Sequence, residues 1–258
     1  TLSSSSAASD VYKRQIIDGA STDGTVEGIR SFAALVNSES VNGEQKKPLT
    51  PHSSLLTLHS SLVTGHSSLV TLHFLSQPDT GIYNAMNKGI KMATGEVVYF
   101  LNSGDILFDR NVLSKVVKEF EKSNADFVFG DIVEVHENQK IERKYWNVSK
   151  LFLYGDMICH QACFFKKSLI EEVGPFNESL RITSDYEYLL KIFRNSDFKR
   201  KHLPEVIVFY DKSGVSVKNV KLLNSERNIL KEKYFNKFEK FLARRKILRW
   251  YYEFRGSK

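Results

Sequence analysis

The sequence predicts an α/β fold in which short buried strands alternate with amphipathic helices around a mainly parallel sheet. Its 258 residues, 41% of them hydrophobic, are enough to bury the core of one domain with an appendage. Apolar strand-like runs and segments with a helical period follow one another along the chain. One such strand stops at a polar Asn-Ser-Gly-Asp corner over 102–105, and open α/β sheets hold their ligands at the carboxyl ends of strands.

The first fifteen residues, TLSSSSAASDVYKRQ, show no strand or helix period, so we leave them out of the fold. Their SDVYKRQ end resembles a translated sequencing adapter, and the alternative is a natural disordered N-terminus. The next segment, IIDGASTDGT, starts in mid-motif. We therefore expect an N-terminally truncated domain over 16–217 that lacks its first strand.

A tandem seven-residue repeat interrupts this domain between His52 and Leu72, with the copies HSSLLTL, HSSLVTG and HSSLVTL. Its Ser and Thr content suits a coiled coil poorly, and its period is too short for a solenoid. We interpret it as a slipped DNA repeat expanded in a surface loop, an insertion over about 48–73. This origin explains the regular spacing of His52, His59 and His66 without a metal.

The other elements follow in alternation. The expected helices cover 24–36, 82–92, 111–122 and 186–192, and the expected strand residues are 16–17, 73–76, 96–101 and 126–129. Thr22 or Asp23 can cap the first helix. The helix at 111–122 has the clearest pattern, with an apolar face formed by Val112, Val116, Val117 and Phe120. This alternation implies right-handed crossovers between parallel strands.

Charge and cysteine content narrow the function classes. The net charge of +7 is concentrated at the C-terminus, because 13 Lys or Arg face 4 Asp or Glu from Lys218 to Lys258. No nucleic-acid-binding module accompanies this charge, so we expect no nucleic-acid partner. Two cysteines cannot form a disulfide framework, and no apolar run reaches the roughly 20 residues of a membrane span. We expect a cytoplasmic protein.

The basic segment over 218–258 has the pattern of an amphipathic helical tail. Leu230, Tyr234, Phe238 and Phe241 recur at helical spacing among lysines and arginines. Two interpretations stay open: peripheral docking on the anionic inner face of the cell membrane, or packing on the domain with a solvated basic face.

Six segments occur in order between residues 16 and 217: IIDGASTDGT, QPDTGIYNAMNKGIKMATGEVVYFLNSGD, FVFGD, CHQACFF, GPFNESLRITSDYEYLLKI and FYDKSGVS. Together they resemble the family 2 glycosyltransferases, which have a GT-A fold. The resemblance implies a mixed sheet flanked by helices, a nucleotide-diphosphate sugar donor and a divalent metal. It also implies inverting transfer to a saccharide or lipid-linked acceptor in cell-surface polysaccharide synthesis.

The resemblance assigns three acidic residues to the donor side. Asp18 matches the Asp that accepts a hydrogen bond from the nucleotide base, with turn formation as the alternative. Asp79, in QPDTG, matches the loop against the nucleotide. Asp105 matches the metal motif Asp-x-Asp, whose first Asp is replaced here by Asn102 or Ser103. A single carboxylate is therefore expected to hold Mg²⁺ or Mn²⁺, with Asn102 among the substrate-binding residues.

On the acceptor side, Asp185 matches the general base that removes the proton of the acceptor hydroxyl. Its alternative role is to cap a helix, and Glu187 is the reserve carboxylate. His160 is assigned to the donor or acceptor channel, with a buried structural histidine as the alternative. Cys159 and Cys163 are interpreted as small core residues and not as zinc ligands.

Two functions from different classes fit this sequence. The first is the glycosyltransferase, in which Trp146 and Tyr154 either line the acceptor groove or pack in the core. The second is a catalytically inactive fragment that binds a partner or a membrane through its tail, an alternative favoured by the expected loss of the first strand.

Overall fold

The computed structural model describes residues 13–18, 27, 55–60, 70–137, 139–212 and 214–245. The chain divides into two compact units. The first consists of Thr1–Tyr99 with Phe165–Glu178, and the second of Phe100–Phe164 with Ser179–Lys258. Each unit is described by itself.

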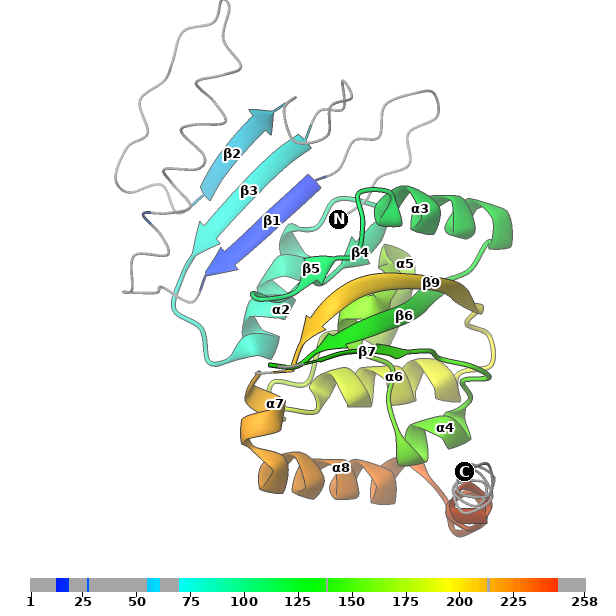
Figure 1. The fold of residues 1–258 in the computed structure, drawn as a ribbon. Helices are drawn as coiled ribbons and strands as arrows, with labels where there is room; N and C mark the ends of the chain where they lie inside the picture. The colour runs from blue at the N-terminus through cyan, green and yellow to red at the C-terminus, as the bar shows by residue number, and fades with distance from the viewer. Residues whose placement is uncertain are drawn as a thin grey trace, which may run out of the picture. The chain divides into compact units, whose positions relative to one another are not determined.

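The first unit contains a three-stranded sheet (Figure 1). Strands β1 (Lys13–Asp18), β3 (Val70–Ser76) and β2 (Leu55–Ser60) lie in that order, with β1 parallel and β2 antiparallel to β3. The first strand begins at Lys13, so three residues of the leader that we had left out of the fold belong to β1. The helix expected over 24–36 lies outside the described residues except for Glu27.

The repeat contributes strands to this sheet, which corrects its interpretation as a surface loop. The first copy supplies most of β2 and the third supplies the start of β3, and Leu58 pairs with Leu72. Both copies end in Leu, Val and Thr residues, LLTL in the first and LVTL in the third, and residues of this kind suit a pleated strand better than a loop. The strand expected at 73–76 therefore starts three residues earlier, at Val70.

Helix α2 (Ile82–Met92) has the predicted bounds. It is fixed within the first unit by Asn87, whose side-chain amide donates to Phe176 O and accepts from Phe176 N at 3.0 and 2.9 Å. Asn84 and Asn87 both donate to the Glu178 carboxylate, and these hydrogen bonds lower the pKa of Glu178. The asparagines of the NAMNKG segment thus attach α2 to the chain after α5 (Lys167–Val173).

The second unit is built on a mixed sheet. Its strand order is β6 (Phe127–Val135), β9 (Arg200–Asp211) and β5 (Ile106–Leu107), and β7 (Lys140–Arg143) pairs with β6. The residues of β8 (Cys163–Lys166) are divided between the two units. The β6–β9 pair is parallel, whereas β5 and β7 run antiparallel to their neighbours. The mainly parallel sheet expected from the alternation is therefore a mixed one. Strand β4 (Val97–Tyr99) belongs to the first unit and is shorter than predicted.

Gly130 shows how closely β6 and β9 approach. A Cβ at this position would lie 2.4 Å from Ile207 Cγ1 and 2.7 Å from the carbonyl oxygen of Glu205. The register of the pair shifts at Gly130, as expected where a strand bends at a bulge. The FVFGD segment therefore requires glycine because another backbone fills the space of a side chain.

Two helices with predicted apolar faces cover the sheet. Helix α3 (Val112–Ser123) buries Val112, Val116 and Phe120, as its pattern indicated. Helix α6 (Ser184–Arg194) is almost entirely buried. Its Phe193 ring lies edge-on to Phe127 of β6, with centroids 6.1 Å apart. The helix that carries Asp185 is thus a core element.

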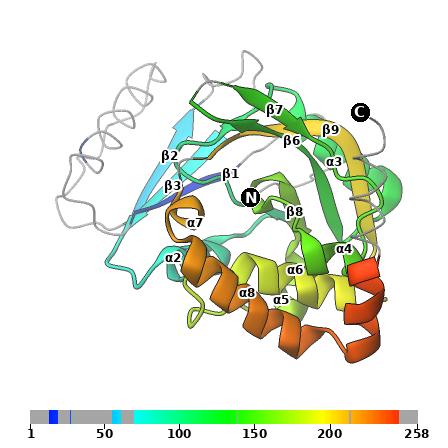
Figure 2. The ribbon, with the colours of Figure 1, turned by 60° about the horizontal axis from the view of Figure 1, so that its bottom comes forward.

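The C-terminal segment packs on this core. Helices α7 (Val215–Lys218) and α8 (Val220–Tyr234) are followed by further helix over 237–245, and α8 runs along α6 in both views (Figures 1 and 2). Leu230 and Tyr234 are buried. The packing interpretation of the tail therefore holds for α8. Within the described residues, no helix combines the length and the apolar character needed to cross a bilayer.

Candidate active site

The carboxylate of Asp105 occupies a tight corner of the second unit. The corner closes through a hydrogen bond from Asp105 N to Asn102 O at 3.2 Å. Asp105 Oδ1 accepts from Asp211 N and Oδ2 accepts from Gln161 Nε2, both at 2.9 Å. Segments from three distant parts of the sequence therefore hold this carboxylate in one orientation.

A second carboxylate, which the sequence analysis did not single out, lies beside this corner. A Cβ added to Gly104 would lie 3.3 Å from Asp211 Oδ2, and Gly104 has a φ of +93°. Glycine is therefore needed for both the left-handed backbone and the approach of Asp211. The signal for Asp211 was its place in the FYDKSGVS segment, but only β9 brings it to Asp105.

Burial raises the pKa of Asp105. Hydrogen bonds from Asp211 N and Gln161 and the electrostatic interaction with His160 oppose this effect, and the negative charge of Asp211 adds to it. Two neighbouring carboxylates in a partly buried corner disfavour each other's ionised form. A bound cation would remove this conflict.

His160 connects the Asp105 corner to Asp185. Its Nδ1 lies 3.0 Å from Asp185 Oδ2, and its Nε2 lies 3.1 Å from Asn102 Nδ2. Because an amide nitrogen only donates, His160 Nε2 accepts, and the ring proton lies on Nδ1, where it donates to Asp185. The imidazole is thus held at both nitrogens, in the tautomer that orients the Asp185 carboxylate.

Asp185 lies in the first turn of α6, and its side chain is 11% exposed. Its Oδ1 accepts a hydrogen bond from Tyr186 N at 2.8 Å. The N-cap of the helix is Thr183. Asp185 therefore accepts from an N–H of the first turn without being the N-cap residue, and its role as general base stays a prediction.

A short 3-10 helix, η1 (His160–Ala162), presents His160 to Asp185 and Gln161 to Asp105. The preceding residue, Cys159, is fixed by a hydrogen bond from its N–H to the Tyr145 hydroxyl at 2.9 Å. Burial raises the thiol pKa of Cys159 and Cys163, so the thiolates that a metal requires are disfavoured. This supports their interpretation as core residues.

Glu226 of α8 holds the loop before Asp185, a role that no sequence motif indicated. The Glu226 carboxylate accepts hydrogen bonds from the backbone N–H groups of Arg181, Ile182 and Thr183 and from the Thr183 hydroxyl, at 2.8–3.1 Å. Glu226 is only 7% exposed. A carboxylate from another helix therefore satisfies N–H groups at the start of α6.

Glu187, the expected reserve carboxylate, faces α8. It is 2% exposed and accepts hydrogen bonds from Lys233 Nζ at 2.8 Å and from the Tyr234 hydroxyl at 3.0 Å. The bond to Glu187 raises the pKa of Lys233. Two residues after Asp185, the helix has turned this side chain toward α8, so the structure assigns Glu187 to the α6–α8 contact.

Two other predicted donor residues belong to the first unit. Asp18 ends β1, in register with Ser76. Asp79 Oδ1 accepts from Gly81 N at 3.0 Å, at the start of α2. Asp79 therefore closes the QPDTG turn, and nucleotide binding by Asp18 and Asp79 stays a prediction.

The residues of the corner fit a divalent metal completed by its substrate. Within the described part of the chain, no three His, Cys, Asp or Glu side chains form a metal-binding cluster. Asp105 and Asp211 nevertheless supply two neighbouring carboxylates. Mg²⁺ is commonly bound by one or two carboxylates together with substrate phosphates and water.

The mixed sheet flanked by helices is a GT-A fold, as its similarity to two solved glycosyltransferases shows. TarS of S. aureus, solved in complex with UDP, superposes with a TM-score of 0.53 at 15% identity over 77% of this chain and 51% of its own. The mannosyltransferase PcManGT from Pyrobaculum calidifontis, in complex with GDP-Man and Mn²⁺, gives 0.52 at 18% identity over 80% and 50%.

Residues 66–173 match the model of glycosyl transferase family 2. A PGL/p-HBAD biosynthesis glycosyltransferase of Mycobacterium bovis is 30% identical over 137 residues, 53% of each chain. The chain thus spans about half the length of the curated relatives it matches. The GT-A fold expected from the sequence is confirmed, and the resemblance to family 2 glycosyltransferases is supported over the matched residues.

Proposed function

We propose that the protein transfers a sugar from a nucleotide-diphosphate donor to a hydroxyl group of a saccharide or lipid-linked acceptor in cell-surface polysaccharide synthesis. The observation that carries this proposal is that adjacent residues of η1 contact two carboxylates. Gln161 binds Asp105, and His160 binds Asp185. This helix joins a carboxylate suited to a metal–diphosphate to a carboxylate suited to deprotonating an acceptor. The similar structures of TarS in complex with UDP or UDP-GlcNAc and of PcManGT in complex with GDP-Man support a nucleotide-sugar donor.

In this proposal Asp105 and Asp211 hold Mg²⁺ or Mn²⁺, which would offset the charge of the departing diphosphate. Asn102 and Gln161 position the corner. Asp185 accepts the proton of the acceptor hydroxyl, and His160 orients Asp185 by donating its Nδ1 proton. Each of these side chains thus has one task, and the binding and proton-transfer tasks fall on different residues.

The first test is metal-dependent donor binding. We expect calorimetry with UDP-GlcNAc or GDP-Man to detect binding in the presence of Mn²⁺ and to lose it with chelator or in Asp105→Asn. Asp109→Asn, the same change four residues away, should bind normally. Because burial raises the pKa of Asp105, protonation should weaken binding on acidification, and it should do so at a higher pH than for an aspartate with its ordinary pKa. Absence of binding by the wild-type chain to both donors would contradict the donor site.

A second candidate function is membrane association, favoured by apolar side chains exposed near the C-terminus. Ile229, Phe238 and Phe241 are 61%, 67% and 50% exposed, and lysines and arginines surround them in the sequence. Such a surface suits the anionic inner face of a cell membrane. A chain that binds membranes but no nucleotide sugar would be a binding module and not an enzyme.

Vesicle co-sedimentation tests this function. The wild-type chain should sediment with vesicles containing phosphatidylserine and less with phosphatidylcholine alone. Phe238→Ser combined with Phe241→Ser should reduce the bound fraction, whereas Phe108→Ser, also at an exposed phenylalanine, should not. Equal sedimentation of wild type with both kinds of vesicle would contradict an electrostatic contact.

A further inference from the structure

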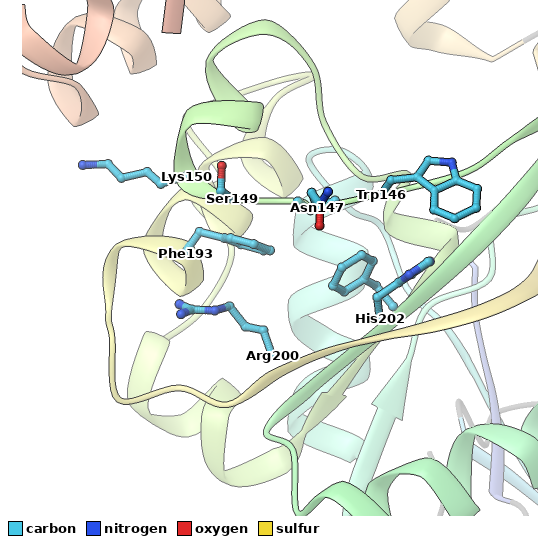
Figure 3. A pocket seen from close by; sticks show the side chains of 9 residues that line it. Trp146, Asn147, Ser149, Lys150, Phe193, Arg200 and His202 are labelled. Atoms are coloured by element: carbon cyan, nitrogen blue, oxygen red, sulfur yellow. The ribbon is translucent and has the colours of Figure 1, made fainter. Parts of the chain in front are cut away.

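The second unit contains a cavity that the proposed donor and base residues do not line. Its volume is about 520 Å³, within the range of small-ligand sites. Phe129, Phe193 and His202 form aromatic walls, Arg200 adds a cation, and the segment 146–150 completes the lining. Figure 3 shows Phe193 and Arg200 on one side and His202 on the other, with Asn147 above them.

This cavity lies at the other end of β9 from the Asp105 corner. Strand β9 starts at Arg200, in the cavity wall, and ends at Asp211, whose N–H binds Asp105. At about 3.3 Å per residue, the two ends are up to about 35 Å apart along the strand. A ligand of this cavity would therefore occupy a site separate from the donor.

The cations around the cavity differ in how their charge is compensated. His202 Nε2 lies 2.8 Å from the buried carboxylate of Asp131, and Lys150 Nζ lies 2.5 Å from Glu239 Oε1. Arg200 has no carboxylate partner among the described residues. One of its terminal nitrogens, Nη1, donates to the carbonyl oxygens of Ile192 and Asn195.

These carbonyls lie at the C-terminal end of α6, where a cation is favourable, but they engage one nitrogen of a guanidinium that has five N–H donors. Burial lowers the pKa of Arg200, as expected for a partly desolvated charge without a counter-ion. An anion placed in the cavity would supply that counter-ion and a second set of hydrogen bonds.

The rim adds an exposed aromatic surface. Trp146 is 69% exposed, far more than most large apolar side chains in this unit, and it contributes to the cavity lining. Asn147, next to it, has a φ of +50°, in the left-handed region. An exposed indole beside polar groups suits a ligand with both an apolar face and hydroxyl groups, as a sugar ring has.

We propose that this cavity binds a negatively charged saccharide, with Arg200 pairing with its carboxylate or phosphate group and Trp146 contacting its ring. The binding itself does not depend on the proposed function. We further infer that the saccharide is a distal part of the acceptor, and this step rests on the proposed function.

Tryptophan fluorescence provides the test. The chain has two tryptophans, so Trp250→Phe leaves Trp146 as the reporter. In this background, glucuronic acid and glucose 6-phosphate should give saturable changes that weaken with salt, and glucose should bind at least about tenfold more weakly. Saturation by inorganic phosphate at the same concentration as glucose 6-phosphate would overturn the saccharide part, and equal binding of glucose would overturn the role of charge.

Variants locate the site. Arg200→Gln removes the charge and keeps a shorter side chain with an N–H donor, and it should weaken binding of glucuronic acid by about tenfold or more. Arg200→Lys should weaken it less, and Lys118→Gln, at an exposed cation on α3, should not change it. If Arg200→Gln lowers the melting temperature, Trp146→Ala followed by calorimetry replaces it, because Trp146 is largely exposed.

Unchanged affinity in both Arg200→Gln and Trp146→Ala would overturn the assignment of the site. Metal-dependent donor binding is measured separately, by calorimetry on the wild-type chain and Asp105→Asn. A chain that binds donor but no anionic saccharide overturns this inference alone, and a chain that binds anionic saccharide but no donor overturns the proposed function alone.

Discussion

Replacing Asp185 by Asn should lower the rate of sugar transfer by about 10²–10⁴-fold, the usual contribution of a general base, and leave donor affinity unchanged. Asn keeps the size, and its one carbonyl oxygen can still accept the hydrogen bond of Tyr186 N or that of His160 Nδ1, but its NH2 group cannot accept the other. It cannot take a proton from an acceptor hydroxyl at neutral pH. The fall should therefore appear in kcat and not in binding.

The measurement is nucleotide diphosphate release from UDP-GlcNAc or GDP-Man with a panel of acceptors, combined with calorimetry of donor binding. Asp197→Asn, at an exposed aspartate beyond α6, is the matched control and should retain the wild-type rate. A wild-type rate in Asp185→Asn would remove Asp185 from the chemistry and leave it as a residue of the α6 N-terminus.

His160 gives this prediction a second readout. Its imidazole orients Asp185 and faces Asn102, so we expect His160→Gln to lower kcat less than Asp185→Asn and to change the pH profile of kcat. A residue with a merely structural role would lower the melting temperature and leave that profile as it is. His160 is thus a positioning residue in this proposal.

Replacing Glu226 by Ala should destabilise the protein by about 3 kcal/mol. The change removes one carboxylate that serves three backbone N–H groups and the Thr183 hydroxyl. Buried donors left without an acceptor lose the hydrogen bonds they would make to water in the unfolded chain. For a chain of this size the melting temperature should fall by roughly 6–12 °C.

Chemical and thermal unfolding measure the loss, and Glu232→Ala is the matched control on the same helix. Glu232 is exposed and pairs only with Lys240 in the described part of the chain, so its loss should cost less than about 1 kcal/mol. Glu226→Gln retains one carbonyl acceptor and should be intermediate. Equal stabilities of the Glu226→Ala and Glu232→Ala variants would show that the loop before Asp185 is held by other contacts.

The sequence predicted well those elements whose pattern is local and strongly periodic. Helix α2 has the predicted bounds, and α3 buries three of the four side chains on its predicted apolar face. The repeat was harder, because its Ser and Thr content suggested a loop while its LLTL and LVTL ends suit a strand. A partner strand in β3 decided between the two.

The candidate site divides in the same way. Asp105 and Asp185 are recognisable because each follows a local motif, a polar corner after a strand and an acidic first turn of a helix. Asp211 lies 106 residues beyond Asp105, and Glu226 lies on another helix than the loop it holds. The FYDKSGVS segment contains Asp211 but does not reveal its role, and no motif marks Glu226, since both roles exist only when distant segments meet.

By itself, the sequence determined the α/β class, the family 2 glycosyltransferase resemblance and the carboxylates around which a site is expected. It could do so because turns, amphipathic faces and motif residues depend on neighbours within a few positions. Only the tertiary structure decided which side chains serve these carboxylates. It directed Glu187 to α8, placed Asp211 beside Asp105 and left Arg200 without a carboxylate partner in the described chain, since hydrogen bonds and charge compensation depend on contacts between segments far apart in sequence.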